Sequence, residues 1–189
     1  MTLFPTGKPH ISFSELFAWK ECPYRHKLLH IDKLGTFEPS PFLGFGTGVH
    51  ASCEDYIETK TLDKSFAMKE IDEYWEENQA GINEYIESNA WCKYDPDREA
   101  WKQIASDILD DVPSFLDETF LEWKGVEAEE QLYESIQNDD MLFKGFIDAV
   151  IICKNNKGQR RIWLLDWKTA GWGWRKEKKQ DFNYQMQLL

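Results

Sequence analysis

Two ionisable residues, Asp166 and Lys168, close an apolar segment that begins at Ile162. The segment is rich in β-branched and aromatic residues, which is typical of a strand. Because side chains alternate between the faces of a strand, Asp166 and Lys168 are expected on one face together with Ile162 and Leu164. Charged groups are costly to bury beside a core. The pair is therefore either a structural ion pair at a strand end or part of a chemical site.

A second carboxylate, Asp148, lies in the preceding strand-like segment, where it shares a face with Phe146 and Val150. Two strands joined by a hairpin can bring Asp148 and Asp166 close enough to share one divalent cation. Carboxylate oxygens suit magnesium or manganese better than zinc. The alternative is that Asp148 only caps or ends its own strand.

Five motifs occur along the chain in a fixed order, and two of them contain these residues. They are Ser12-Phe13-Ser14-x-Leu16-x-x-Trp19-x-x-Cys22-Pro23, Gly46-Thr47-Gly48-Val49-His50-x-x-x-Glu54, Gly145-Phe146-Ile147-Asp148, Leu164-Leu165-Asp166-Trp167-Lys168-Thr169 and Tyr184-x-x-Gln187-Leu188. In this combination the chain resembles the PD-(D/E)XK nuclease superfamily, and within it the RecB-like exonuclease branch. The resemblance implies an α/β fold with a restriction-endonuclease-like core, in which helices flank a small central mixed β-sheet.

The resemblance also implies roles for individual residues. Asp148 and Asp166 would hold the metal ion, with the backbone carbonyl of Trp167 as a third ligand. Lys168 would lie beside the attacking water and stabilise charge on the phosphorane. His50 would be a fourth ligand through one imidazole nitrogen, whereas a histidine in a helix without this context is usually structural or solvated.

A polar helix face is expected near the C-terminus, because Gln180, Tyr184 and Gln187 are spaced by four and three residues. This face could grip the substrate backbone or position the water, and the resemblance places Tyr184 and Gln187 among the catalytic residues. Basic side chains at the start of the helix would bind phosphates together with Gln180, or would form a solvated face; they are Arg175, Lys176, Lys178 and Lys179. Trp172 and Trp174 could stack bases, although packing is the favoured interpretation.

Further carboxylates could support the site from a second layer. Glu54 lies one helical turn after His50, where a solvated helix face explains it equally well. Glu129 and Glu130 lie on the first predicted strand, and the sequence does not choose between them. Glu130 is the candidate for a supporting carboxylate from this strand.

The four cysteines, Cys22, Cys53, Cys92 and Cys153, form no C-x-x-C pair and are expected to be free thiols. Some members of the resembling branch bind an iron–sulfur cluster through one N-terminal cysteine and three cysteines after the last helix. Cys22 matches the first position, but no such trio follows it up to Leu189. An iron–sulfur cluster is therefore not expected in this chain.

The elements that must position these residues follow from periodicity and turn signals. Helices are predicted over residues 12–30 with an interruption at Pro23, from 46–48 to 59, and over 63–89, 97–123 and 176–189. A loop is predicted over residues 35–48, and an antiparallel meander over 126–136, 141–153 and 161–168. In the fourth helix the predicted buried stripe consists of Trp101, Ile104, Ile108, Val112, Phe115 and Trp123. A single domain over residues 1–189 is expected, mainly helical up to residue 125.

Composition limits the possible classes of protein. The 189 residues are 42% hydrophobic and 15% aromatic, which excludes a disordered chain. The net charge is −12, but residues 51–140 hold 26 acidic and 7 basic residues, whereas residues 141–189 hold 4 acidic and 10 basic residues. A polyanion could therefore approach the basic end. The sequence shows no membrane-length apolar run and no signal peptide, so a cytoplasmic location in a bacterial or phage-infected cell is expected.

The combined interpretation is a Mg²⁺- or Mn²⁺-dependent deoxyribonuclease. More specifically, an exonuclease of the phage or recombination-repair type is expected. It would hydrolyse phosphodiesters of single- or double-stranded DNA ends with a metal-activated water. A homo-oligomer or a helicase or recombination partner is a further hypothesis. The alternatives are a catalytically inactive nucleic-acid-binding or adaptor subunit with the same fold, a purely structural protein, and a nuclease that acts on RNA.

Overall fold

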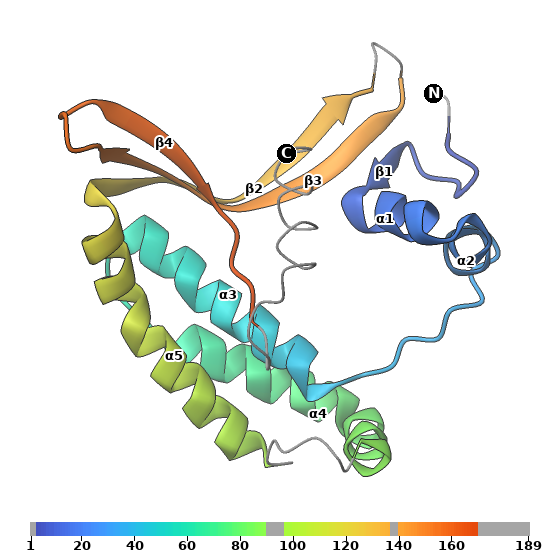
Figure 1. Ribbon diagram of the computed structural model, residues 1–189. Coiled ribbons are helices and arrows are strands. Elements are labelled where there is room, and N and C mark those ends of the chain that lie inside the picture. The colour runs from blue at the N-terminus through green and yellow to red at the C-terminus, as the bar shows by residue number, and fades with distance from the viewer. Residues whose placement is uncertain (1–2, 90–96, 137–139, 170–189) are drawn as a thin grey trace. The chain divides into compact units, whose positions relative to one another are not determined.

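A computed structural model describes residues 3–89, 97–136 and 140–169 of the chain (Figure 1). In order, the elements are β1 (His10–Ser12), α1 (Phe13–Glu21), α2 (Pro23–His26), the π-helical turn η1 (Lys27–Ile31), α3 (Pro41–Thr59), α4 (Ser65–Ser88), α5 (Arg98–Thr119), β2 (Leu121–Ser135), β3 (Leu142–Lys154) and β4 (Arg160–Leu165). The chain forms two compact units. The first contains the described residues of Met1–Phe37 and Glu130–Ile147, and the second contains Glu38–Glu129 and Asp148–Thr169.

The sheet is mixed, because β3 pairs with parallel and antiparallel partners. β1 runs parallel to the start of β3, with His10 opposite Leu142, whereas β4 runs antiparallel to its later part. β2 is the other neighbour of β3. The predicted α/β fold with a mixed sheet and flanking helices is confirmed. β1 was not predicted, because a three-residue strand with a distant parallel partner leaves no local signal in the sequence.

In the first unit, α1 and α2 are capped as their sequences suggest. The Ser12 side chain accepts a hydrogen bond from the Glu15 amide at 3.3 Å and so caps α1. The predicted interruption at Pro23 is confirmed, because Pro23 opens α2 and the Cys22 sulfur accepts from the Arg25 amide at 3.5 Å. The carboxylate of Glu15 is buried and lies 3.2 Å from Nε2 of His26.

In the second unit, α3 begins at Pro41, which corrects the predicted loop up to residue 48. Proline is well tolerated in a first helical turn, and the glycines that suggested a loop instead permit close packing on α4. A Cβ atom at Gly48 would lie 2.8 Å from the carbonyl oxygen of Ala67, and one at Gly44 would lie 2.6 Å from the ring of Tyr74. The glycines therefore set how closely α3 approaches α4.

The core of the second unit lies between α3, α4, α5 and one face of the sheet. From β3 it receives Ala149, Ile151 and Cys153. The predicted stripe on α5 is only partly correct: Trp101 and Val112 are buried, but Ile108 and Phe115 are 42% and 51% exposed. Their places in the core belong to Ala105, Leu109 and Leu116. α5 also runs through Pro113 and ends at Thr119, so Trp123 lies on β2 and not on the helix.

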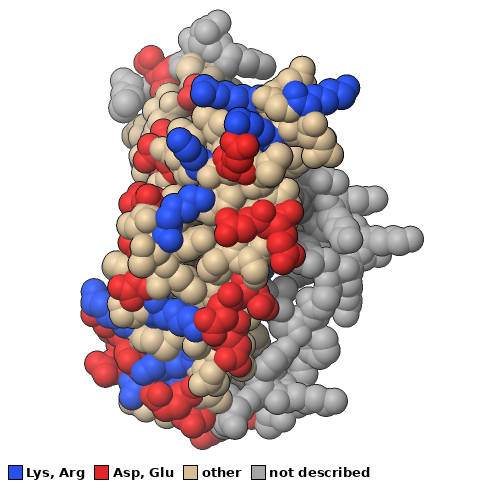
Figure 2. All heavy atoms as spheres, turned by 90° about the vertical axis from the view of Figure 1, so that its left-hand side faces the viewer, with Lys and Arg blue, Asp and Glu red and all other residues tan. Residues whose placement is uncertain are grey.

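Acidic and basic side chains are interspersed over the face drawn in Figure 2. Ion pairs join α5 to α4 and to the residue before α4: Lys102 pairs with Asp72 at 2.9 Å, and Asp110 pairs with Lys64 at 2.6 Å. Exposed pairs of this kind contribute about 0–1 kcal/mol each. Among the residues that the structure describes, no helix is both long and apolar enough to span a bilayer.

Candidate active site

The two carboxylates predicted for the site come from neighbouring positions of the sheet. Ala149 of β3 lies opposite Leu165, the last residue of β4. Asp148 precedes Ala149 and Asp166 follows Leu165, so both carboxylates leave the backbone where the two strands separate. β4 thus ends before Asp166, whereas the sequence predicted a strand up to Lys168. Strand alternation therefore does not decide which face Asp166 and Lys168 occupy.

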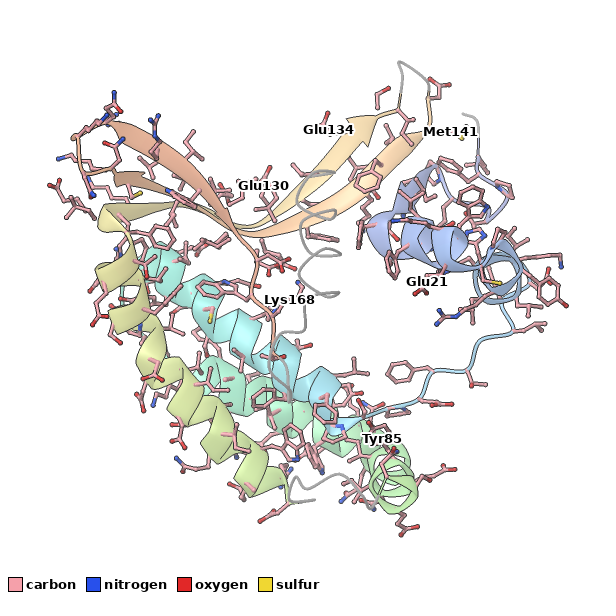
Figure 3. All side chains as sticks on the ribbon, in the orientation of Figure 1. Glu21, Tyr85, Glu130, Glu134, Met141 and Lys168 are labelled. Carbon is pink, nitrogen blue, oxygen red and sulfur yellow. The ribbon has the colours of Figure 1, made fainter. Side chains whose placement is uncertain are left out.

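Helix α3 brings His50 to the same place. Nδ1 of His50 lies 3.7 Å from Oδ2 of Asp148, and the two side chains are 26% and 15% exposed. One turn before His50, a Cβ atom at Gly46 would lie 3.4 Å from Oγ1 of Thr169. The segment that follows β4 therefore passes beside α3, as the labelled Lys168 shows in Figure 3.

The backbone and side chain after Asp166 complete the arrangement. The Trp167 amide donates a hydrogen bond to Oδ2 of Asp148 at 2.6 Å. Nζ of Lys168 lies 2.6 Å from Oδ2 of Asp166 and donates to the Trp167 carbonyl at 3.4 Å. The Asp166 side chain is only 5% exposed, whereas that of Lys168 is 38% exposed. One ammonium group thus neutralises a buried carboxylate and can still reach solvent.

The electrostatics at Asp148 are balanced between opposing effects. Burial raises the pKa of this carboxyl above its ordinary value, and the nearby charge of Asp166 raises the pKa further. The Trp167 amide, His50 and Lys168 act in the opposite direction, because each favours the ionised carboxylate. The net upward shift of the pKa shows that burial and Asp166 outweigh these favourable contacts, whereas a bound cation would favour the ionised carboxylate.

The pKa of Glu54 is raised as well. Burial, followed by the charges of Glu129, Asp148 and Glu58, raises the pKa of Glu54 to about 7. The adjacent Cys53 thiol is buried, and its burial and the same acidic surroundings raise its pKa to about 12, so it is inert as a nucleophile. Glu54 is therefore a half-buried carboxyl that titrates near neutral pH beside the candidate site.

The donor chemistry of the site suits a hard divalent ion. Carboxylate oxygens, an imidazole nitrogen and a backbone carbonyl are ligands for magnesium or manganese. Two ligands of an octahedral ion with bonds of about 2.1 Å lie about 3 Å apart when adjacent and about 4.2 Å apart when opposite. The separation of 3.7 Å between Nδ1 of His50 and Oδ2 of Asp148 lies between these two values, so the two atoms are near each other without having octahedral spacing.

The third donor, Asp166, is held by Lys168. Within the described ranges, no group of three or more His, Cys, Asp or Glu side chains is close enough to hold a metal ion. The fit to a divalent ion thus rests on the donor chemistry of these residues and on the proximity of one pair, His50 and Asp148. The complete predicted ligand set, including Asp166 and the Trp167 carbonyl, stays a prediction.

The structure describes only some of the other predicted residues. Glu129, rather than Glu130, acts on the charge state of Glu54, whereas Glu130 belongs to the other compact unit and its role stays a prediction. The three cysteines that the structure describes, Cys22, Cys53 and Cys153, are free thiols. Several predicted catalytic, substrate-binding and stacking residues lie outside the described residues: Trp172, Trp174, Arg175, Lys176, Lys178, Lys179, Gln180, Tyr184 and Gln187, together with the predicted last helix.

Sequence reasoning missed two contributors to the site. One is the backbone amide of Trp167, which orients Asp148 and leaves no signal in the identity of a side chain. The other is the choice of Glu129, which adopts a φ of 50° within β2. This left-handed backbone conformation interrupts the alternation of side chains along the strand. It is uncommon for glutamate, so the sequence does not predict it.

The family model of the PD-(D/E)XK nuclease superfamily matches residues 10–189. The gene 69 protein of Mycobacterium phage D29 is 26% identical over 180 residues, which are 86% of this chain and 63% of that relative. The chain therefore spans less than two thirds of the length of this relative, whose name states no activity. No solved structure matches the chain.

Proposed function

The chain belongs to the PD-(D/E)XK nuclease superfamily, and from this premise we propose that it hydrolyses DNA phosphodiesters with Mg²⁺ or Mn²⁺. Members of this superfamily are generally nucleases and typically use divalent metals. The observation that carries the proposal is the approach of His50 to Asp148 at 3.7 Å. These two residues are far apart in the sequence, and each belongs to a different predicted motif.

A bound divalent ion would supply positive charge for the phosphate and lower the pKa of a water molecule. The protein residues prepare this site. The Trp167 amide holds Asp148 in one orientation towards His50. In the arrangement described here, Lys168 contacts Asp166 and the Trp167 carbonyl, the same two groups that the resemblance assigns to the metal.

We therefore propose that Lys168 exchanges partners during the reaction. Its ammonium group would release Asp166 and turn towards the scissile phosphate or the attacking water, where a positive charge stabilises the transition state. The exposure of the Lys168 side chain, 38%, leaves room for this movement. Lys168 is thus proposed both as a stabiliser of the metal-free site and as a catalytic residue.

The finer proposal is an exonuclease of the RecB-like branch. Its support is the order of the five sequence motifs, of which the first forms α1 and the start of α2 and the second lies within α3. The proposed catalytic roles of Tyr184 and Gln187 belong to the same interpretation. The expected homo-oligomer and helicase partner receive no support from the comparisons and are not carried further.

The test is digestion of 5′- and 3′-labelled single- and double-stranded DNA, with circular DNA alongside, in Mg²⁺, Mn²⁺ or EDTA. Metal-dependent loss of one end label with circular DNA spared would support an exonuclease. Cleavage should be lost in Asp166→Ala and Lys168→Ala. It should persist in the control variants Asp110→Ala and Lys154→Ala, which remove ion-paired side chains of the same types elsewhere.

Two results would contradict the proposal. If the intact chain cleaved no DNA with any metal, the enzyme assignment would be wrong, and an inactive DNA-binding or structural relative would be the better description. If Asp166→Ala cleaved as fast as the intact chain, the nuclease site would lie elsewhere.

A further inference from the structure

The sheet of the first unit carries two exposed aromatic rings with a lysine between them. Tyr133 of β2 is 39% exposed and Phe146 of β3 is 41% exposed. Nζ of Lys144 lies 4.9 Å from the centre of the Phe146 ring and 5.7 Å from the centre of the Tyr133 ring. Large aromatic side chains usually gain free energy by burial, so a pair left open beside a cation indicates a binding surface.

The Tyr133 ring is held in place from the opposite edge of the sheet. Its hydroxyl lies 3.2 Å from Nδ1 of His10 in β1, and the two rings meet edge to face at 5.4 Å. β1 and β2 are the two neighbours of β3 at this point, so the Tyr133 side chain crosses over β3. The ring is thereby ordered before any ligand binds, which reduces the entropy cost of binding.

The charge pattern of the strands favours an anionic ligand on this face. Strand alternation puts Tyr133 on the face opposite to Glu130 and Glu134, the two carboxylates that β2 contributes here and that are labelled in Figure 3. Lys144 and Phe146 share the Tyr133 face, because they contact one another and Lys144 contacts the Tyr133 ring. Within residues 10–12, 130–135 and 142–147, this face therefore carries a lysine and no carboxylate.

We propose that His10, Tyr133, Lys144 and Phe146 form an aromatic platform that binds single-stranded DNA. Bases would stack on the two rings, since every base has a π-face, and Lys144 would contact a phosphate. The inference rests on the proposed nuclease function and names the form of DNA that the protein holds. Phe146 lies two positions before Asp148 in the sequence of β3.

The test is the fluorescence anisotropy of a labelled 20-nucleotide oligo(dT) titrated with the full chain at low salt. EDTA is present, so that neither metal binding nor cleavage affects the result. Phe146→Leu and Tyr133→Leu keep an apolar side chain but remove the π-face, and each should weaken binding about tenfold. Lys144→Gln should weaken binding and reduce its dependence on salt.

Matched controls separate the platform from general surface effects. Phe66→Leu removes a ring of similar exposure, 42%, from α4, and Lys157→Gln removes an exposed lysine from the turn between β3 and β4; both should bind like the intact chain. Circular dichroism of each variant shows whether it is folded. The oligo(dT) binding of Phe66→Leu and of Tyr133→Leu is compared at equal concentrations of folded protein.

The outcomes also separate this inference from the proposed function. If the intact chain does not bind oligo(dT), or if Phe146→Leu and Tyr133→Leu bind as tightly as Phe66→Leu, the platform is overturned even when metal-dependent cleavage is observed. If cleavage is absent but oligo(dT) binding is lost in the platform variants, the platform stands and the nuclease proposal fails.

Discussion

Gly46 and Gly48 lie shortly before His50 in α3, and replacing each by alanine tests why the motif contains glycine. A Cβ atom at Gly48 would lie 2.8 Å from the Ala67 carbonyl oxygen and 3.1 Å from Cγ1 of Ile71. A backbone carbonyl cannot rotate away, so α3 and α4 would have to move apart. A Cβ atom at Gly46 would meet only Oγ1 of Thr169 at 3.4 Å, an ordinary contact.

The magnitudes follow from these contacts. Overpacking costs about 1–3 kcal/mol, and a contact with a backbone atom belongs in the upper half of that range. Replacing glycine by alanine inside a helix returns about 1 kcal/mol. Gly48→Ala should therefore destabilise the protein by about 1–2 kcal/mol, whereas Gly46→Ala should stabilise it by up to about 1 kcal/mol. For a chain of this length, the difference of about 1–3 kcal/mol between the two variants corresponds to about 2–12 °C in Tm.

The assay is thermal unfolding of both variants and the intact chain, followed by circular dichroism at 222 nm in EDTA. Scanning calorimetry of the same samples would provide the unfolding enthalpy needed to convert Tm into free energy. A Gly48→Ala variant that melts at or above the Tm of Gly46→Ala would refute the close approach of α3 to α4. The glycines would then have to be explained by a role in the chemistry.

Three further predictions concern the site and the core. Because the folded pKa of Glu54, about 7, is above its ordinary 4.5, its stabilising contribution is complete below pH 4.5 and is lost as the pH rises through 7. Urea titrations in EDTA should show that Glu54→Gln stabilises the protein at pH 8 but not at pH 4.5, unlike the control Glu84→Gln at an exposed position of α4. Lys168→Met should abolish cleavage but tighten Mn²⁺ binding in calorimetry, since Asp166 is then no longer neutralised; weaker Mn²⁺ binding would argue against the exchange of partners. Leu109→Ala should cost about 2–5 kcal/mol in denaturant unfolding and Ile108→Ala less than about 1 kcal/mol, because Leu109 is fully buried and Ile108 is 42% exposed; equal costs would contradict the orientation of α5.

The proximity of Asp148 and Asp166 was predictable because it depends on local patterns. The turn at residues 155–158 sets the register of β3 against β4, and that register places Asp148 beside Asp166. His50 lies about a hundred residues away, and only the resemblance to a known family connected it with the two aspartates. The observed approach of 3.7 Å supports that connection through geometry.

The errors arose where tertiary contacts decide the local structure. Phe115 and Ile108 have the hydrophobicity of core residues and fit a helical period, yet the neighbouring stripe of Ala105, Leu109 and Leu116 faces the core. Both stripes satisfy the period of 3.6 residues, so periodicity cannot choose between them. In the same way, Gly44 and Gly48 suggest a loop until the surface of α4 is placed against them.

The distance along the chain between His50 and Lys168 also orders events during synthesis. Ribosomes add about 5–20 residues each second, so the 118 residues from 50 to 168 take about 6–24 s to appear. Helices α3, α4 and α5 and their mutual contacts can form within that interval, since all three precede β2. The segment that carries Asp166 and Lys168 can only then dock beside α3. A newly made chain would thus hold a folded helical scaffold for several seconds before the residues of the proposed nuclease site can come together.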